Sequence, residues 1–95
     1  DQVAIGLMRG LQAAGVHIPD DISVIGFDDI FVAELVTPGL TTVAAPLRAE
    51  GRIAVRTVLS LVNGSPGRTD QSRVLPVQLV TRSSTARCRA RKRKR

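Results

Sequence analysis

Residues 19–30, PDDISVIGFDDI, decide the fold that this 95-residue chain is expected to adopt. Pro19 and the two aspartates that follow it favour a turn. Residues 22–27 are mostly apolar and rich in β-branched side chains, which is typical of a β-strand covered on both faces. Asp28 and Asp29 follow directly, at the carboxyl end of the predicted strand. This is the edge of a parallel sheet at which α/β proteins bind ligands.

Helical and extended patterns alternate on both sides of this strand. The opening helix has apolar residues at spacings of three and four, and we expect Asp1 to cap it and Gly15 to end it. The expected elements are a helix over 2–15, one or two helical turns within 30–36, a strand over 40–45, a helix over 46–62 and a strand over 74–82. Pro76 makes the last of these either an edge strand or an irregular crossing segment. This alternation predicts an α/β fold with a mainly parallel sheet.

Both long helices are predicted to pack one apolar side against the sheet. In the first helix this side comprises Ala4, Leu7, Met8, Leu11 and Ala14. In the second it comprises Leu47, Gly51, Ala54, Val58, Leu61 and Val62.

The composition excludes several function classes. Phe27 and Phe31 are the two aromatic residues, so the core must be aliphatic and stacking platforms for single-stranded nucleic acid are absent. Cys88 is the single cysteine, which excludes an internal disulfide and a multi-cysteine metal site. No run approaches the ~18 apolar residues of a membrane helix, and no export signal opens the chain. We therefore expect a cytoplasmic protein without a membrane partner.

The positive charge gathers at the C-terminal end. The formal net charge is +6, yet residues 1–86 hold seven arginines and eight acidic side chains. Residues 87–95 carry seven cations in nine positions and are expected to form a disordered basic tail. The tail either contacts nucleic-acid phosphates without sequence preference or is a solvated terminus. We favour the second interpretation, because charge runs alone rarely specify a partner.

Residues 1–86 resemble the lactose, galactose and purine repressor family, whose ligand domains are similar to periplasmic sugar-binding proteins. The resemblance rests on residues 19–30, on Leu-Thr-Thr-Val at 40–43 and on the closing Arg-x-Ser-Thr pattern at 82–85. Further matches are Ala4, Gly6, Ala14, Gly15, Pro38, Pro46, Gly51, Gly64, Leu75, Pro76, Leu79 and Val80. The resemblance implies a partial periplasmic-binding-protein-like fold of type I, with three layers. It also implies that DNA is contacted only through a missing N-terminal domain.

The ligand domain of this family has two lobes, and its chain crosses between them three times. The resemblance assigns residues 1–44 to the second lobe, the helix after Pro46 to the first, and the strand near 75–80 to the second again. The helix over 46–62 then lacks most of the sheet on which it should pack. We therefore expect the isolated chain to be poorly folded or to associate with itself.

Asp28 is the central candidate for ligand binding, with Phe27 beside it. A carboxylate at a strand end can accept two hydrogen bonds from neighbouring sugar hydroxyls or from a purine. The matching aspartate of the repressor family contacts the effector. The alternative is that Asp28 and Asp29 cap the next turn, and for Asp29 we favour capping. Asp1 is likewise interpreted as a helix cap rather than a ligand contact.

The resemblance also brings Ala45, Leu47 and Glu50 toward the same cleft. This chain departs from the lactose repressor, which has a polar amide and bulky apolar side chains at these places. The departure leaves the effector defined only by its class, as a small sugar-like or nucleoside-like molecule. Leu47 equally fits the core, and Glu50 equally fits the solvated side of the helix.

The resemblance further implies a homodimer. The opening helix of the family contributes to the dimer interface, which makes Ile5, Met8 and Val36 candidate interface positions. The alternative for all three is simple burial against the sheet.

No catalytic, metal or cofactor site is predicted. His17, the single histidine, lies in a connector without a cysteine or serine partner pattern. Asp28 and Asp29 are adjacent in sequence, whereas glycosidase carboxylates lie ~5 to 9 Å apart across a sugar. The leading prediction is the effector-binding and dimerising part of a transcriptional regulator, in which the effector shifts the population of the DNA-competent form. The alternative is a periplasmic sugar-binding protein of an import system. A basic nucleic-acid-binding peptide and a hydrolase rank below both.

Overall fold

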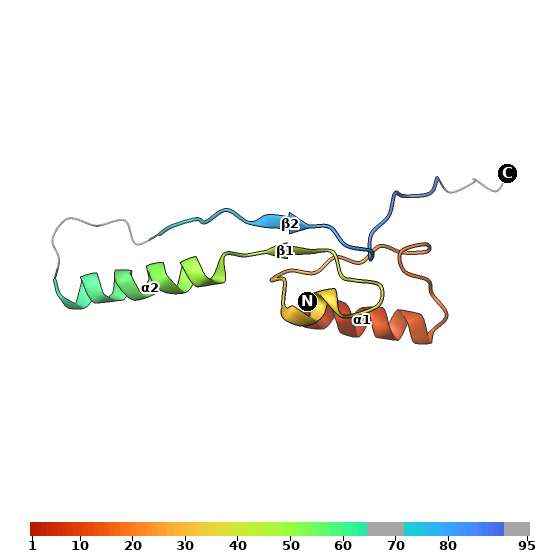
Figure 1. Ribbon diagram of the computed structural model, residues 1–95, viewed down its shortest axis with the longest axis horizontal. Coiled ribbons are helices and arrows are strands. Elements are labelled where there is room, and N and C mark those ends of the chain that lie inside the picture. The colour runs from red at the N-terminus through yellow and green to blue at the C-terminus, as the bar shows by residue number, and fades with distance from the viewer. Residues whose placement is uncertain (65–71, 91–95) are drawn as a thin grey trace. The chain divides into compact units, whose positions relative to one another are not determined.

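The structure, a computed structural model, describes residues 1–64 and 72–90. In these ranges the elements are α1 (Gln2–Ala13), the 3-10 helix η1 (Phe31–Glu34), β1 (Thr42–Ala44), α2 (Leu47–Val62) and β2 (Gln78–Val80) (Figure 1). The chain divides into two compact units. The first unit comprises Asp1–Ala44 and Leu79–Arg95, and the second comprises Ala45–Gln78. The first boundary, after Ala44, coincides with the predicted crossing there, whereas the second, after Gln78, lies within the predicted strand near 75–80.

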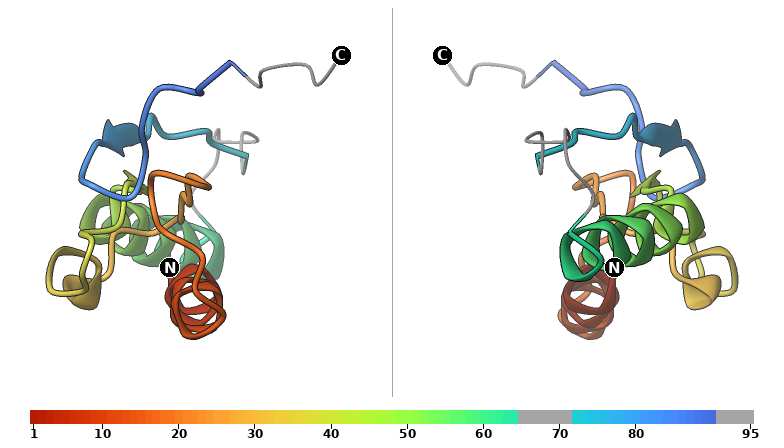
Figure 2. Two further views of the ribbon diagram at one scale, coloured as in Figure 1. Left: turned by 90° about the vertical axis from the view of Figure 1, so that its right-hand side faces the viewer. Right: turned by 90° about the vertical axis from the view of Figure 1, so that its left-hand side faces the viewer.

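The first unit has an aliphatic core beneath α1. Ala4 and Met8 are buried, and Ile5 and Leu11 pack against them. Leu7, which was expected on the packed side, is instead half exposed. The prediction that Leu7 packs against the sheet is wrong, because the core covers a narrower side of α1 than the apolar residues of the sequence occupy. Both α1 and η1 lie on one side of the extended segments (Figure 2).

Helix α1 ends two residues earlier than expected. Gly15 adopts the left-handed conformation, with φ of 80°, that glycine tolerates without steric cost. The N–H of Val16 then donates to the Leu11 carbonyl at 2.9 Å, which satisfies one of the last carbonyls of the helix.

The extended segment over 22–27 runs parallel to the residues around β1. Its one bridge pairs Ile25 with Thr41. The N–H of Gly26 donates to the Thr41 carbonyl at 2.9 Å, and the N–H of Asp28 donates to the Val43 carbonyl at 2.8 Å. The predicted strand is therefore present as a short parallel pairing.

The prediction that both faces of this segment are covered is wrong within the first unit. Val24 is 4% exposed, whereas Ile25 and Phe27 are 56% and 51% exposed. Successive side chains of extended backbone point to opposite faces. The first unit packs one of these faces and leaves the other uncovered.

The residues after β2 belong to the same core. Ser84 is fully buried. Its hydroxyl donates to the Val24 carbonyl at 2.6 Å and accepts the N–H of Thr41 at 2.8 Å. The N–H of Val24 donates to the Ser84 carbonyl at 3.0 Å. Leaving one such buried group unpaired costs about 1–3 kcal/mol, so this serine holds two chain segments together.

Strands β1 and β2 form a two-stranded sheet. Each spans three residues, fewer than the predicted ranges 40–45 and 74–82. Pro76, which has no N–H to donate to a neighbouring strand, precedes β2 instead of interrupting it.

Helix α2 is the main element of the second unit. It begins one residue later than predicted, because Pro46 is its N-cap, and ends at Val62 as predicted, but none of its residues is buried. Leu47, Val58 and Leu61, from its predicted apolar side, are all more than half exposed. Isolated helices of this length are marginal in water, because most helix stability comes from packing of the apolar side.

No helix within residues 1–64 and 72–90 has the length and hydropathy needed to span a bilayer.

Candidate functional site

The backbone turns sharply at the end of the extended segment. Asp28 and Asp29 have φ angles of 110° and 57°, in the left-handed region that side chains with a Cβ rarely occupy. Residues held in this way cost roughly 1–3 kcal/mol each and persist only where surrounding contacts fix them. Contacts to this turn therefore matter for the position of both carboxylates.

Asp29 forms an ion pair and does not cap the next turn. Its Oδ1 accepts a hydrogen bond from Nη2 of Arg82 at 2.7 Å. Nη1 of the same guanidinium donates to the Leu40 carbonyl at 2.9 Å. Helix η1 has no side-chain cap. The capping prediction is wrong because a guanidinium from a distant part of the chain engages the carboxylate.

Asp1 occupies the N-cap position of α1, but its side chain does not cap the helix. Its Oδ1 accepts from the buried Thr42 hydroxyl at 2.6 Å, and its Oδ2 accepts from the N–H of Ile30 at 2.8 Å. The Asp1 nitrogen donates to the Phe27 carbonyl at 3.0 Å. The capping prediction fails because these partners compete for the carboxylate, and Asp1 instead fixes the turn around Asp28.

The Asp28 carboxylate differs from its neighbours. It is exposed, and none of the described residues forms a hydrogen bond or ion pair with it. Phe27, the other predicted ligand residue of the first unit, is half exposed and directly precedes Asp28 in sequence. An exposed carboxylate can accept hydrogen bonds from the hydroxyls of a polyhydroxylated ring, and an exposed apolar side chain can pack against the carbon face of such a ring.

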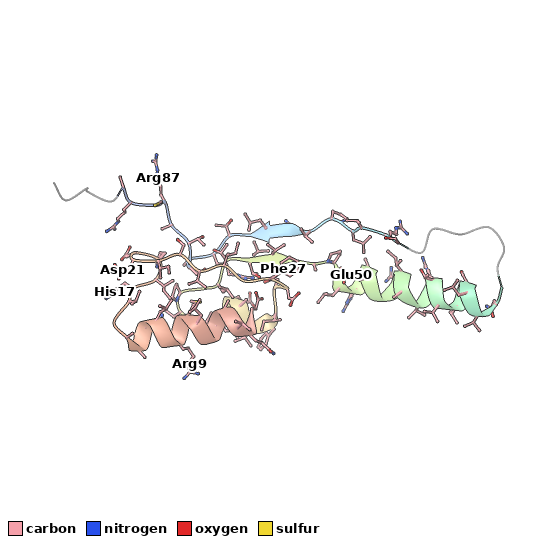
Figure 3. All side chains as sticks on the ribbon, turned by 180° about the vertical axis from the view of Figure 1, so that it is seen from behind. Arg9, His17, Asp21, Phe27, Glu50 and Arg87 are labelled. Carbon is pink, nitrogen blue, oxygen red and sulfur yellow. The ribbon has the colours of Figure 1, made fainter. Side chains whose placement is uncertain are left out.

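The remaining predicted ligand residues belong to the second unit. Ala45 is partly buried, whereas Leu47 and Glu50 are exposed on the first turn of α2 (Figure 3). Their convergence with Asp28 stays a prediction.

The candidate interface residues lie in or next to the first core. Met8 is 2% exposed, and Ile5 and Val36 are partly buried against the same cluster. Val3 and Leu7 of α1 are the exposed apolar side chains nearby in sequence. The interface role of the candidate residues stays a prediction.

Sequence reasoning missed the polar residues that fix the turn. In the sequence, Arg82, Thr42 and Ser84 stand out only as parts of the patterns that carry the family resemblance. In the structure, the Arg82 N–H donates to Thr41 Oγ1 at 2.9 Å, and this hydroxyl also bonds the Thr85 hydroxyl. Threonines and serines within otherwise apolar strands were the available signal, because buried hydroxyls need partners.

His17 lies in the predicted connector and pairs with Asp21 (Figure 3). The Asp21 carboxylate accepts from the His17 N–H at 2.8 Å, and this hydrogen bond lowers the pKa of that carboxyl. Both side chains are exposed. Among the described residues, no three potential metal-ligating side chains gather.

The described part of the basic tail, residues 87–90, is exposed and contains neither helix nor strand. Arg89 lies 3.6 Å from the Asp20 carboxylate, and both side chains are exposed. The rest of the predicted disordered tail, residues 91–95, lies outside the described residues.

Comparison with known proteins places this geometry in a family. The family model of the periplasmic binding protein-like domain matches residues 1–85. The HTH-type transcriptional regulator MalR of Streptomyces coelicolor is 41% identical over 86 residues, which is 90% of this chain and 25% of the regulator. The LacI family transcriptional regulator of Enterococcus faecalis V583, solved with bound ribose, superposes with a TM-score of 0.84 at 40% identity. That match covers 94% of this chain and 33% of the regulator.

The chain belongs to the lactose repressor (LacI) family. A crystal structure of the lac repressor dimer bound to operator and the anti-inducer ONPF superposes with a TM-score of 0.79 at 36% identity, over 90% of this chain and 29% of that repressor chain. The periplasmic-binding-protein-like fold expected from the sequence is thereby confirmed. The two-stranded sheet represents only a small part of the expected layered sheet. This LacI-family chain spans about a quarter of the length of MalR.

Gly26 tests the packing around the Asp1 carboxylate. A Cβ at this position would collide with Asp1 Oδ1 and lie 2.9 Å from Leu40 Cδ2. We predict that Gly26→Ala lowers the free energy of unfolding by about 1–3 kcal/mol, the usual cost of overpacking. The control is Gly10→Ala within α1, where nothing lies within 4 Å of the added Cβ. This control should stabilise the helix by up to about 1 kcal/mol. Urea unfolding of both variants within a complete LacI-family ligand domain, followed by circular dichroism, measures both free energies of unfolding, and equal midpoints would contradict the packing.

Proposed function

We propose that this chain is the effector-binding and dimerising part of a LacI-family transcriptional regulator. The observation that carries the proposal is the exposed Asp28 carboxylate, which belongs to a turn in which the Asp28 N–H, the Ile30 N–H and the Asp29 carboxylate are already paired. A carboxylate with free acceptor positions suits a ligand rich in hydroxyl groups. The ribose-bound Enterococcus faecalis regulator supports a sugar-like effector.

In this proposal the rest of the regulator completes the site. Residues that the chain does not span supply the DNA-binding part and most of a type I, mainly parallel sheet. Ala45, Leu47 and Glu50 contribute from the second unit as that sheet covers α2. The uncovered apolar side of α2 supports this arrangement, because such a surface needs a partner.

Binding is the only chemistry that the proposal requires. The effector shifts the balance between two arrangements of the lobes by binding one of them more tightly, and this changes the population able to bind DNA. No cofactor takes part, and the protein acts in the cytoplasm, where its operator is. A periplasmic import protein is the less favoured alternative, because the curated relatives are transcriptional regulators.

The proposal is testable in a completed domain, in which residues 1–95 replace the matching third of the Enterococcus faecalis regulator. Ribose, galactose, lactose and adenosine serve as probes in calorimetric titrations. We predict that the completed domain binds at least one probe. Asp28→Ala should weaken that binding by about five- to 150-fold, the equivalent of 1–3 kcal/mol for a lost charged acceptor.

Asp20→Ala is the matched control, because Asp20 is an exposed carboxylate in the preceding turn. It should leave the affinity unchanged. Binding of no probe, or equal affinities for Asp28→Ala and Asp20→Ala, would contradict the proposed site.

We further propose that α1 contributes to a homodimer, with Ile5, Met8 and Val36 supporting its contact surface from beneath. The dimeric lac repressor to which the chain is similar supports this assembly. Leu7 is half exposed on α1 and is not needed to fill the core. It is therefore the position at which a change can disturb association without unfolding the chain.

Leu7→Lys is predicted to convert the completed domain from dimer to monomer, because it places a charge in an apolar contact. Arg9→Ala is the control, since Arg9 lies on the side of α1 that points away from the extended segments (Figure 3). Sedimentation equilibrium measures the oligomeric state of both variants. A Leu7→Lys protein that remains dimeric at the same concentration would refute the interface.

A further inference from the structure

The turn that carries Asp28 is held from both sides by groups other than the Asp28 carboxylate. The Phe27 carbonyl and the Ile30 N–H are both paired with Asp1, at 3.0 and 2.8 Å. The N–H of Asp28 is paired with the Val43 carbonyl at 2.8 Å. Only Asp29 is fixed through its side chain, by the ion pair with Arg82.

The Asp29–Arg82 ion pair is anchored at three points. The guanidinium spans the Asp29 carboxylate at 2.7 Å and the Leu40 carbonyl at 2.9 Å. The Arg82 N–H is fixed by the buried Thr41 hydroxyl at 2.9 Å. The Arg82 and Asp29 side chains are 19% and 27% exposed, so water screens the pair less than it screens a pair on the open surface.

The ion pair holds a turn whose backbone is in the left-handed region. With φ angles of 110° and 57°, Asp28 and Asp29 would relax toward ordinary extended backbone if nothing held them. Relaxation on either side of Asp28 would redirect its carboxylate. A binding group whose orientation is fixed before the ligand arrives loses less conformational freedom on binding.

We propose that Asp29 and Arg82 are positioning residues, which act on the effector only through the orientation of Asp28. This inference rests on the proposed function, because it assumes that Asp28 contacts the effector. It assigns no ligand contact to Asp29 or Arg82, since each is occupied by the other. Both residues should therefore influence affinity only while the Asp28 carboxylate is present.

A double-mutant cycle in the completed domain tests this dependence, with the strongest-binding of the four probes as ligand. Arg82→Ala alone is expected to lower the affinity about tenfold, within the range of coupling between neighbouring residues. In the Asp28→Ala background, Arg82→Ala should cause no further loss. A purely structural role for Arg82 would lower the affinity equally in both backgrounds.

Conservative variants distinguish orientation from unfolding. Asp29→Asn keeps an oxygen that accepts from Arg82 and a residue type that tolerates left-handed backbone, so it should retain affinity within about threefold. Asp29→Ala should lose about tenfold. Arg82→Lys keeps the charge but can satisfy only one of the two acceptors, and an intermediate loss is expected. Arg87→Ala removes one exposed cation from the same C-terminal segment and should have no effect.

Thermal unfolding without ligand identifies any variant that fails to fold, in which case the cycle is repeated with Arg82→Lys. Equal losses from Arg82→Ala or Arg82→Lys in both backgrounds would overturn the positioning role, as would no loss in either. If Asp28→Ala itself has no effect on any probe, or if no probe binds, the proposed function fails and the inference fails with it.

Discussion

The parallel pairing of residues 24–28 with residues 41–43 is the constraint on which the first unit depends. Two backbone hydrogen bonds and one bridge define it, which is too little to stabilise a sheet by itself. Ser84 therefore joins the two segments at one end through a buried hydroxyl, and the Asp1 carboxylate joins them at the other through Thr42 and Ile30. The direction in which Asp28 leaves the segment follows from this pairing.

The same arrangement leaves apolar side chains exposed in both units. The first unit encloses a small aliphatic core, whereas no residue of α2 is buried in the second. The outward side chains of the extended segment, Ile25 and Phe27, are half exposed, like the apolar side of α2. In a LacI-family regulator of three to four times this length, further sheet and helices are available to cover such surfaces.

Residue spacing was sufficient to predict α1 and α2. The family resemblance predicted a crossing after residue 44, where the first unit is interrupted, and a return by the strand near 75–80, within which the second unit ends at Gln78. It also singled out Asp28, whose exposure in the structure is compatible with that role. The predicted capping roles of Asp1 and Asp29 were wrong. Capping depends on residues that are close in sequence, whereas the actual partners of the two carboxylates, such as Thr42 and Arg82, are distant in sequence. The predicted strand lengths and the predicted cover on both faces of residues 22–27 were wrong for a related reason, since both depend on neighbouring elements that are not among the described residues.

In the proposed function, a preoriented Asp28 carboxylate contacts the effector. A crystal structure of the completed domain with its bound probe is the decisive experiment. We expect an Asp28 oxygen to lie about 2.6–3.2 Å from a ligand hydroxyl or ring nitrogen, with Asp29 still paired to Arg82. A ligand bound elsewhere, or one whose polar atoms all lie beyond hydrogen-bond distance from Asp28, would contradict it.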